Sequence, residues 1–460
     1  MRILKLLILV FVLGITSKTS AQEIYNADYT FTIEGLAAGE SMRLAYYLGD
    51  KQYIKQESLS QEGGLVNFKI DTLHVGLCML VFPDNNYFEF VAKEPRVIMK
   101  TNKDDVIGAM EVIASEENAK LYEYLKYNNQ RQMDLQKIED NAQLNDEQKA
   151  TMRIDMDQKG QVRQKEFVEK YPNSFMAKLI STSMDYVPKE APEGLSDDEI
   201  NAFRFYEYRK HYFDNIDFSQ SDLLYSPVYH PKLMAYTDQL TLQQPDSLIA
   251  ATEYLLGKAS ANDEYFKYTL ITLLNKFAKT KVICQDEVYL HLVDNYYLSG
   301  KAVWMDEVGL TKLKVSADNL RNNLCGKLAV NFELPDINGT KQSLYAQSAE
   351  YTILAFMQTD CIPCEKVLEE LSKIDQTILP SFKVVTVFKE GDKAVWKGVL
   401  MGKTKSNWVN LMNDDGALNS ERDYNVQSYP TLYLLDKDKR IVLKRISASQ
   451  IVDYMNTVNN

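Results

Sequence analysis

The motif Cys361-Ile362-Pro363-Cys364 constrains this chain more than any other feature of its sequence. Residues 351–357, which are separated from it by three residues, are almost all apolar, and residues 365–371, directly after it, are amphipathic. This order predicts a buried strand, a short turn and two cysteines at the start of a helix. The unpaired N–H groups and partial positive charge of a helix N-terminus lower the pKa of a cysteine placed there and favour its thiolate. Cys364 follows one turn later and can close a disulfide with Cys361, so the motif indicates thiol–disulfide exchange.

Two other interpretations of this cysteine pair are a structural disulfide and half of a zinc site. A zinc site needs two further ligands. The sequence has no second Cys-x-x-Cys, and its four histidines form no pair with ligand spacing; they are His74, His211, His230 and His291. The spacing therefore favours a redox pair, and we expect neither a metal nor a bound cofactor.

The remaining cysteines are Cys78, Cys284 and Cys325, which are scattered along the chain. A disulfide scaffold in a secreted domain would be denser and would have an even number of cysteines. We therefore expect these three to be free, buried and inert, because free cysteine is among the most buried residue types.

Residues 1–21 have the layout of a secretory signal peptide. Arg2 and Lys5 give a basic start, the ten residues from Leu6 to Ile15 form an apolar stretch, and Thr19-Ser20-Ala21 offers a cleavage site. Since a bilayer-spanning helix needs about 20 apolar residues, we expect cleavage rather than a stable membrane anchor. The mature protein is then exported and soluble.

The chain is acidic, with a formal net charge of −12. Removing residues 1–21, which carry Arg2, Lys5 and Lys18 and no acid, takes this charge to −15. Such a protein is poorly suited to bind nucleic acid or an anionic membrane surface. The charge is expected to serve solubility.

The length of 460 residues predicts about three domains after the signal peptide. Residues 22–105 contain short alternating segments separated by turn residues, which predicts an antiparallel β-sandwich. Residues 106–325 are predicted to be mostly α-helical, because apolar residues recur at helical spacing. Aromatic clusters in this helical region either pack in its core or line a ligand groove. His211 and His291 lie beside aromatic residues, and either could act as a general base. Since the sequence offers no nucleophile for them to activate, we expect both to be structural.

Residues 326–460 alternate between apolar strands and amphipathic helices. The expected strands are 352–357, 383–389, 408–412, 431–435 and 440–444, and the expected helices are 361–379, 392–401, 417–424 and 448–458. This alternation predicts an α/β domain with a central sheet covered on both faces.

The last segment resembles a thioredoxin fold, and more narrowly the TlpA/ResA-like family of exported thiol–disulfide oxidoreductases. Residues 328–339 are similar to the entry hairpin of that family, and Tyr429-Pro430-Thr431 matches the Pro-Thr that opens a strand opposite the cysteines. Cys364 and Pro430 are 66 positions apart, which leaves room for the strand and helix that the family inserts. Residues 22–325 resemble the accessory domains fused to TlpA-like modules in Bacteroidota, which implies a periplasmic location.

The resemblance implies a role for each residue of the motifs. Cys361 is the attacking thiolate on a protein disulfide, and Cys364 resolves the mixed disulfide that forms. Pro363 makes the turn rigid. Pro430 is expected to be cis and to shape the substrate groove, where the backbone of Tyr429 pairs with an extended substrate segment.

Three positions depart from the thioredoxin pattern. Asp360 replaces the usual aromatic residue before the first cysteine; its charge should raise the pKa of Cys361, unless it caps the helix. Ala355 stands where thioredoxins carry a buried acid, and Glu365 is the nearest acid downstream. Tyr429 is bulkier than the usual residue before the proline, which should narrow the choice of substrate.

Ile362 and Pro363 carry no charge or hydrogen bond that could hold a thiolate, and Asp360 lies alongside, so the reduced dithiol gains little stability. We therefore predict a low reduction potential and hence a reductase. A reductase in an oxidising compartment needs an electron source, which we expect to be a membrane donor. The alternative is a binding or scaffold protein that uses the two upstream domains and carries a weakly active or inactive thioredoxin module.

Overall fold

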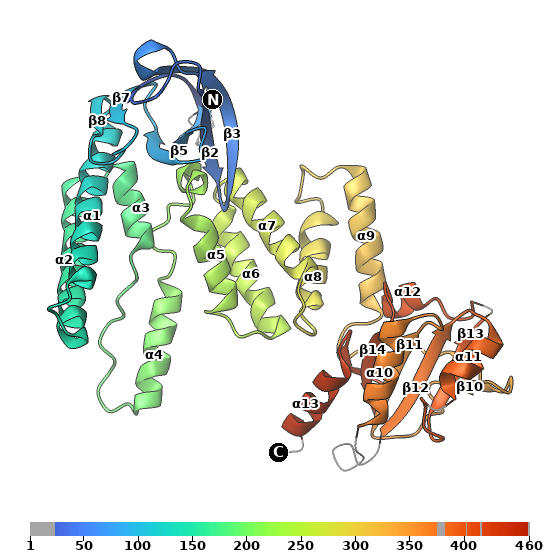
Figure 1. Ribbon diagram of the computed structural model, residues 1–460. Helices are drawn as coiled ribbons and strands as arrows, with labels where there is room; N and C mark the ends of the chain where they lie inside the picture. The colour runs from blue at the N-terminus through green and yellow to red at the C-terminus, as the bar shows by residue number, and fades with distance from the viewer. Residues whose placement is uncertain (1–23, 375–381, 402, 415, 459–460) are drawn as a thin grey trace, which may run out of the picture. The chain divides into compact units, whose positions relative to one another are not determined.

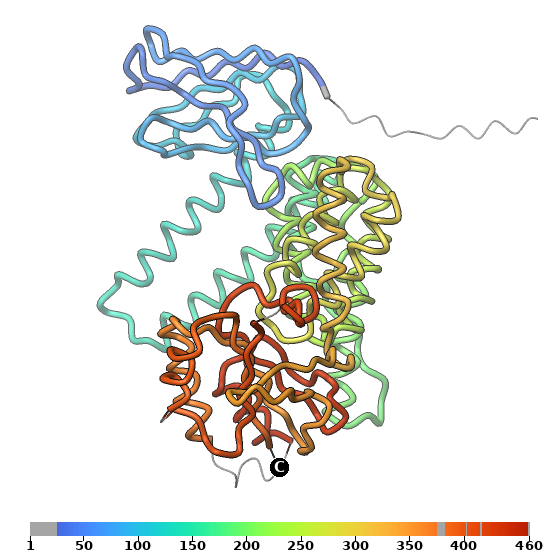
Figure 2. Tube along the Cα trace, turned by 90° about the vertical axis from the view of Figure 1, so that its right-hand side faces the viewer, coloured from blue at the N-terminus to red at the C-terminus, as the bar shows by residue number. Residues whose placement is uncertain are grey.

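The computed structural model describes residues 24–374, 382–401, 403–414 and 416–458. The chain divides into two compact units, one of which extends to Tyr236 and includes Gly257–Phe266, while the other comprises Thr237–Leu256 and the chain from Lys267 onwards. Along the chain, β-rich residues come first, helices follow, and an α/β segment comes last (Figures 1 and 2). This order confirms the predicted fold class, with β-rich, helical and α/β regions in succession.

The N-terminal region consists of two four-stranded sheets, ordered β4-β1-β7-β8 and β3-β2-β5-β6. Their bounds are β1 Ile24–Glu34, β2 Ser41–Leu48, β3 Lys51–Leu59, β4 Leu65–His74, β5 Gly76–Val81, β6 Tyr87–Ala92, β7 Arg96–Asn102 and β8 Glu111–Ala114, with a short turn η1 at Glu62–Gly64. Phe31 of β1 lies against Phe88 and Phe90 of β6, with ring centroids 5.7 and 5.2 Å apart, so the two sheets face each other across an aromatic core. The strand pairs are antiparallel except for β1 and β7, which run parallel. The parallel pair departs from the predicted antiparallel sandwich, and β8 lies in the region 106–325 that was predicted to be helical.

Cys78 lies on β5 inside this sandwich and is a free thiol, as predicted. Burial raises the pKa of Cys78 to about 12. At pH 8 about one molecule in 10⁴ then carries the reactive thiolate. We expect iodoacetamide to leave Cys78 unmodified in the native, oxidised protein and to modify it fully in guanidinium chloride, as measured by peptide mass spectrometry. Rapid labelling of Cys78 in the native protein would contradict this prediction. The positive control is a dithiothreitol-treated sample, in which the freed thiol of Cys361 should be modified.

The helical region begins with two long helices that pack side by side. The bounds are α1 Glu116–Asp140, α2 Asp146–Lys170, α3 Phe175–Ser183, α4 Asp197–Lys210, η2 Ser221–Tyr225, α5 Tyr229–Asp238, α6 Pro245–Ala259, α7 Asp263–Ala278, α8 Asp286–Leu292, η3 Val293–Tyr297 and α9 Glu307–Arg321. Asn145 forms a capping box with Gln148 and starts α2, and Ser174 accepts from the backbone N–H of Ala177 and starts α3. Arg163 on α2 pairs with Glu123 on α1 at 2.7 Å.

The C-terminal α/β region is built on a five-stranded sheet of order β13-β12-β11-β14-β15. Its elements are β9 Glu333–Pro335, β10 Lys341–Ser343, β11 Tyr351–Met357, α10 Ile362–Ser372, β12 Phe382–Lys389, α11 Lys393–Leu400, β13 Val409–Asn413, α12 Ser420–Tyr424, β14 Thr431–Asp436, β15 Ile441–Lys444 and α13 Ala448–Val458. The central strand β11 runs parallel to β12 and antiparallel to β14.

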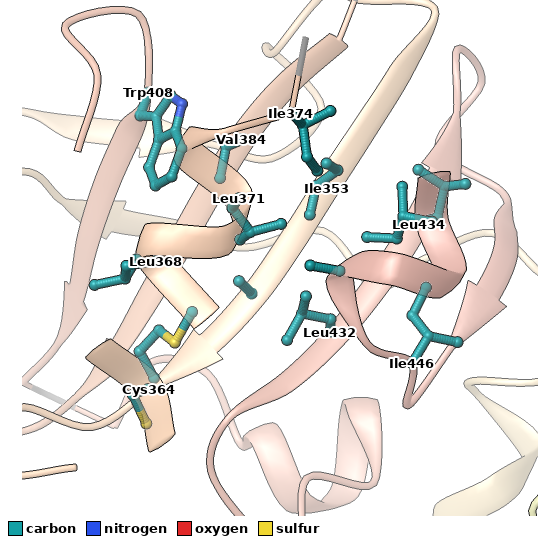
Figure 3. Packing of buried hydrophobic residues seen from close by; sticks show 14 of the residues in the cluster. Ile353, Cys364, Leu368, Leu371, Ile374, Val384, Trp408, Leu432, Leu434 and Ile446 are labelled. Carbon is teal, nitrogen blue, oxygen red and sulfur yellow. The ribbon is translucent and has the colours of Figure 1, made fainter. Parts of the chain in front are cut away.

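Both faces of this sheet are covered, which explains why β11 is apolar apart from Thr352. Ile353, Ala355 and Met357 share a buried cluster with side chains of α10, α11 and α13. Leu354 and Phe356 point to the other face, into a cluster formed with the β9–β10 segment and α12. Figure 3 shows the first cluster, with Cys364 and Leu368 of α10 beside the sheet.

The stretch that precedes β9 runs along β15. The backbone N–H of Ile441 donates to Lys327 at 2.8 Å, and that of Ala329 donates to Lys439 at 2.9 Å. On the far side of the sheet, Asp336 forms a bridge with Leu411 of β13. The chain from Lys327 to Asp336, which includes β9, therefore contacts both outer strands.

Cys284 and Cys325 form a disulfide across a sequence separation of 41. The prediction that both are free is therefore wrong, and of the three scattered cysteines only Cys78 is free. The chain between them forms α8, η3 and α9 and returns to its starting point, which sequence spacing does not reveal. The five cysteines thus make two disulfides and one buried thiol.

Two predictions fall on residues outside those that the structure describes. They are the signal peptide at 1–21 and the last part of the helix expected at 361–379. Among the described residues, no helix combines the length and the apolar character needed to cross a bilayer.

Candidate redox site

Cys361 lies at the start of α10, where it is the N-cap residue. Its backbone is extended, and its Sγ atom accepts from the backbone N–H of Cys364 at 3.1 Å. Pro363 occupies the first turn, where its missing N–H costs no helical hydrogen bond. An N–H donor and the helix dipole both favour a negative charge on the Cys361 sulfur once the disulfide is reduced.

Cys361 and Cys364 are joined in a disulfide and differ sharply in exposure. Cys361 is half-buried, whereas Cys364 is 1% exposed and belongs to the core cluster beneath α10 (Figure 3). An incoming disulfide or thiol can therefore reach Cys361, while the body of the domain shields Cys364.

The second motif lies beside the first. The pairing of β11 with β14 places Phe356 opposite Thr431, so the residues that precede β14 lie next to the cysteines. The Tyr429–Pro430 peptide bond is cis, as the resemblance implies. The carbonyl oxygen of Tyr429 lies 3.9 Å from Cys361 Sγ. The structure thus brings together Cys361, Cys364, Tyr429 and Pro430.

The two acidic residues predicted to tune the site have different surroundings. Asp360 is exposed and is not the helix cap, because Cys361 takes that position. Glu365, in the first turn of α10, pairs with Lys403 from the segment after α11. This lysine offsets the negative charge of Glu365. Sequence reasoning missed Lys403 because it lies 38 residues from its partner.

Beneath the cysteines, Ala355 is fully buried. The cluster around Ala355 and Cys364 consists of apolar side chains together with the cysteine pair. A methyl group thus occupies the position of the thioredoxin acid, and Cys364 has an apolar environment. Across the described residues, no three metal-ligating side chains gather into a group that could hold an ion.

His211 and His291 each pair locally with a carboxylate of the helical region. The Nδ1 atom of His211 lies 2.5 Å from Asp214, and the ring stacks on Tyr186. The Nε2 atom of His291 lies 2.7 Å from Glu253. Neither histidine lies in the C-terminal α/β region that carries the cysteine pair.

The region that carries Cys361 and Cys364 matches a known protein family. Residues 349–441 match the family described as thioredoxin-like. The C-terminal domain is thioredoxin-like. Residues 139–323 match a domain of unknown function, DUF5106.

Individual proteins similar to this chain carry related names. The thioredoxin-like protein YneN of Bacillus subtilis is 30% identical over 113 residues, which are 24% of this chain and 65% of that protein. A thioredoxin-like protein from Bacteroides caccae covers 60% of this chain and 99% of its own, with 19% identity and a TM-score of 0.46. A domain of a possible thiol-disulfide isomerase from Cytophaga hutchinsonii covers 30% of this chain and 95% of its own, with 26% identity and a TM-score of 0.27. The thioredoxin-like domain and its Cys361–Cys364 disulfide support a redox function in general.

Proposed function

We propose that this protein is an exported thiol–disulfide oxidoreductase that reduces protein disulfides through Cys361 and Cys364. The observation that carries the proposal is the unequal exposure of the two sulfurs at the start of α10, with Tyr429 and cis-Pro430 beside the accessible one. An accessible nucleophile, a shielded resolving thiol and an adjacent backbone carbonyl are what a two-step exchange on a polypeptide requires.

The reaction consists of two displacements at sulfur. The Cys361 thiolate attacks one sulfur of the client disulfide, a Cys361–client bond forms, and the other client sulfur leaves as a thiolate. Cys364 then loses its proton and attacks Cys361 Sγ, which releases the second client thiolate and leaves the Cys361–Cys364 disulfide. Since Ala355 offers no carboxylate, the Cys364 proton passes to a client thiolate or to water. Two electrons and two protons from a dithiol donor restore the reduced pair.

The proposed location is the periplasm, with a membrane protein as the electron donor. Residues 1–21 have the pattern of a cleavable signal peptide. The Cys284–Cys325 disulfide supports the same proposal, because structural disulfides persist in oxidising compartments.

The reduction potential tests the direction of electron flow. The start of α10 favours the Cys361 thiolate, but the exposed carboxylate of Asp360 beside it opposes that effect. Ile362 and Pro363 add no charge, so the net stabilisation of the dithiol is small. We expect a potential well below that of the strong oxidant DsbA, about −120 mV. Equilibrium with dithiothreitol and glutathione buffers, quenched by alkylation and read as peptide mass, measures it. A value close to that of DsbA would show that the protein is an oxidant.

Insulin reduction by the full chain separates the enzyme from the alternative scaffold function. The full chain is the appropriate sample, since a fragment beginning at residue 326 lacks Asp286 and Asn323, which contact the buried Lys444 of β15. A folded full-length protein that fails to reduce insulin would favour the binding or scaffold function.

A further inference from the structure

Lys444 is a buried charge on β15 of the thioredoxin-like domain. It is 4% exposed. Its ammonium group lies 2.5 Å from Asp286 and donates to the backbone oxygen of Asn323 at 2.6 Å and to its side-chain oxygen at 3.1 Å. Burial lowers the pKa of Lys444, and Asp286 opposes that effect. A buried ammonium is costly unless such partners stay in place.

Both partners come from outside the sheet, from the two segments that the Cys284–Cys325 disulfide joins. Asp286 is two residues after Cys284, and Asn323 is two residues before Cys325. We call Cys284, Cys325, Asp286, Asn323 and Lys444 the Lys444 clamp. The disulfide therefore joins the two segments to each other, while the ion pair of Asp286 and the hydrogen bonds of Asn323 hold them to Lys444 on β15.

The loop that carries Cys284 depends on the bond. The φ angle of Cys284 is +70°, in the left-handed region that a cysteine seldom adopts. Ile283, one residue earlier, packs on the cluster around Cys364. Once the sulfur–sulfur bond is broken, the loop is free to leave this backbone conformation, and Asp286 and Ile283 move with it.

The disulfide is also accessible. Cys284 and Cys325 are both half-buried, and Cys284 lines a surface pocket together with Thr280, Asp286 and Lys444. A small dithiol can therefore reach it, in contrast to the shielded Cys364.

The strand held by the clamp pairs with β14, the strand that follows cis-Pro430. Lys444 pairs with Tyr433 of β14, and the backbone N–H of Arg445 donates to Leu432 at 2.7 Å. Strand β14 begins at Thr431, directly after cis-Pro430. A change in the position of β15 therefore acts directly on β14, which begins beside cis-Pro430.

We propose that the Cys284–Cys325 disulfide is a redox-sensitive clamp on β15. A dithiol reductant supplies two electrons and two protons, the sulfur–sulfur bond is replaced by two thiols, and the reductant becomes a disulfide. The loop 280–286 is then released, Lys444 loses its fixed partners, and β15 loosens beside the strand that carries Pro430. This device goes beyond the proposed activity and does not depend on it.

Hydrogen exchange on the full chain tests the clamp. We compare wild type with Cys284→Ser/Cys325→Ser, both with the Cys361–Cys364 disulfide intact by mass. Amides of 280–286 and 441–445 should exchange at least about tenfold faster in the variant, whereas 409–413 in β13 should be unchanged. Lys281→Met, an exposed lysine of the same loop, is the matched control and should behave as wild type. A folded variant with unchanged exchange in 441–445 overturns the proposal.

A second measurement keeps Cys284 and Cys325 in place and breaks their bond by reduction. In the Cys361→Ser/Cys364→Ser background, dithiothreitol titration should reduce Cys284–Cys325 while the protein remains folded, and exchange in 441–445 should rise with the reduced fraction. Lys444→Met in that background should remove the dependence, since β15 then no longer needs Asp286 and Asn323. A pair that resists reduction until the protein unfolds, or a dependence that survives Lys444→Met, overturns the proposal.

Discussion

Cys364→Ser is expected to convert the protein into a trap that stays covalently bound to its clients, whereas Cys361→Ser should abolish disulfide reduction altogether. The two sulfurs are chemically alike, and the difference follows from their positions. Cys361 is half-buried at the N-cap of α10, and Cys364 is 1% exposed beneath it. Only Cys361 can therefore attack a client disulfide. Only Cys364 is placed to resolve the mixed disulfide that results.

The measurement is insulin reduction with dithiothreitol for both variants, followed by non-reducing electrophoresis of cell extracts that express Cys364→Ser. We expect client adducts that disappear on reduction. The Cys361→Ser/Cys364→Ser variant is the matched control and should form none. Reductase activity retained by Cys361→Ser, or adducts formed through Cys364, would reverse the assigned roles.

Removing the Cys284–Cys325 disulfide should cost about 4 kcal/mol in the free energy of unfolding. The bond closes a sequence separation of 41, so its loss restores much conformational freedom to the unfolded chain. For a compact unit of this size, such a loss lowers the melting temperature by roughly 8–16 °C. Thermal and urea unfolding of Cys284→Ser/Cys325→Ser, followed by circular dichroism, measures both quantities.

The matched control for this stability prediction is Cys361→Ser/Cys364→Ser. Its disulfide spans a separation of 3, so the same chain-entropy argument gives a loss of only about 2 kcal/mol. A larger loss from the short-range pair than from the long-range pair would show that loop closure is not the dominant contribution.

The redox motif could be predicted from the sequence because its signals are local. An apolar run, a turn and an amphipathic run specify the strand, the N-cap and the helix that present Cys361. The pairing of Cys284 with Cys325 has no such signal, since it depends on the path of α8, η3 and α9 back to their starting point. An unexplained lysine beside the apolar run Ile441–Leu443 was the one available hint that a distant acid approaches β15.

The departures from the thioredoxin pattern also divide into features that sequence position reveals and features that depend on the folded chain. Sequence position alone identified Asp360 and Ala355, and the structure shows the former exposed and the latter fully buried. Whether Asp360 caps α10 depended on the backbone angles of its neighbour, which the sequence left open. The parallel pairing of β1 with β7 likewise depends on contacts between strands some 70 residues apart, where short-range alternation carries no information.

The stretch from Gly326 to Asp336 determines how a client can approach the sheet. Free N–H and C=O groups on an outer strand are a template on which another chain can add a strand. Here Lys327 and Ala329 already pair with β15, and Asp336 bridges Leu411 of β13. Strand addition at these positions is therefore blocked, both for a client and for a second copy of the protein. Under the proposed function, a client segment instead pairs beside Cys361, where the carbonyl oxygen of Tyr429 lies 3.9 Å from the sulfur.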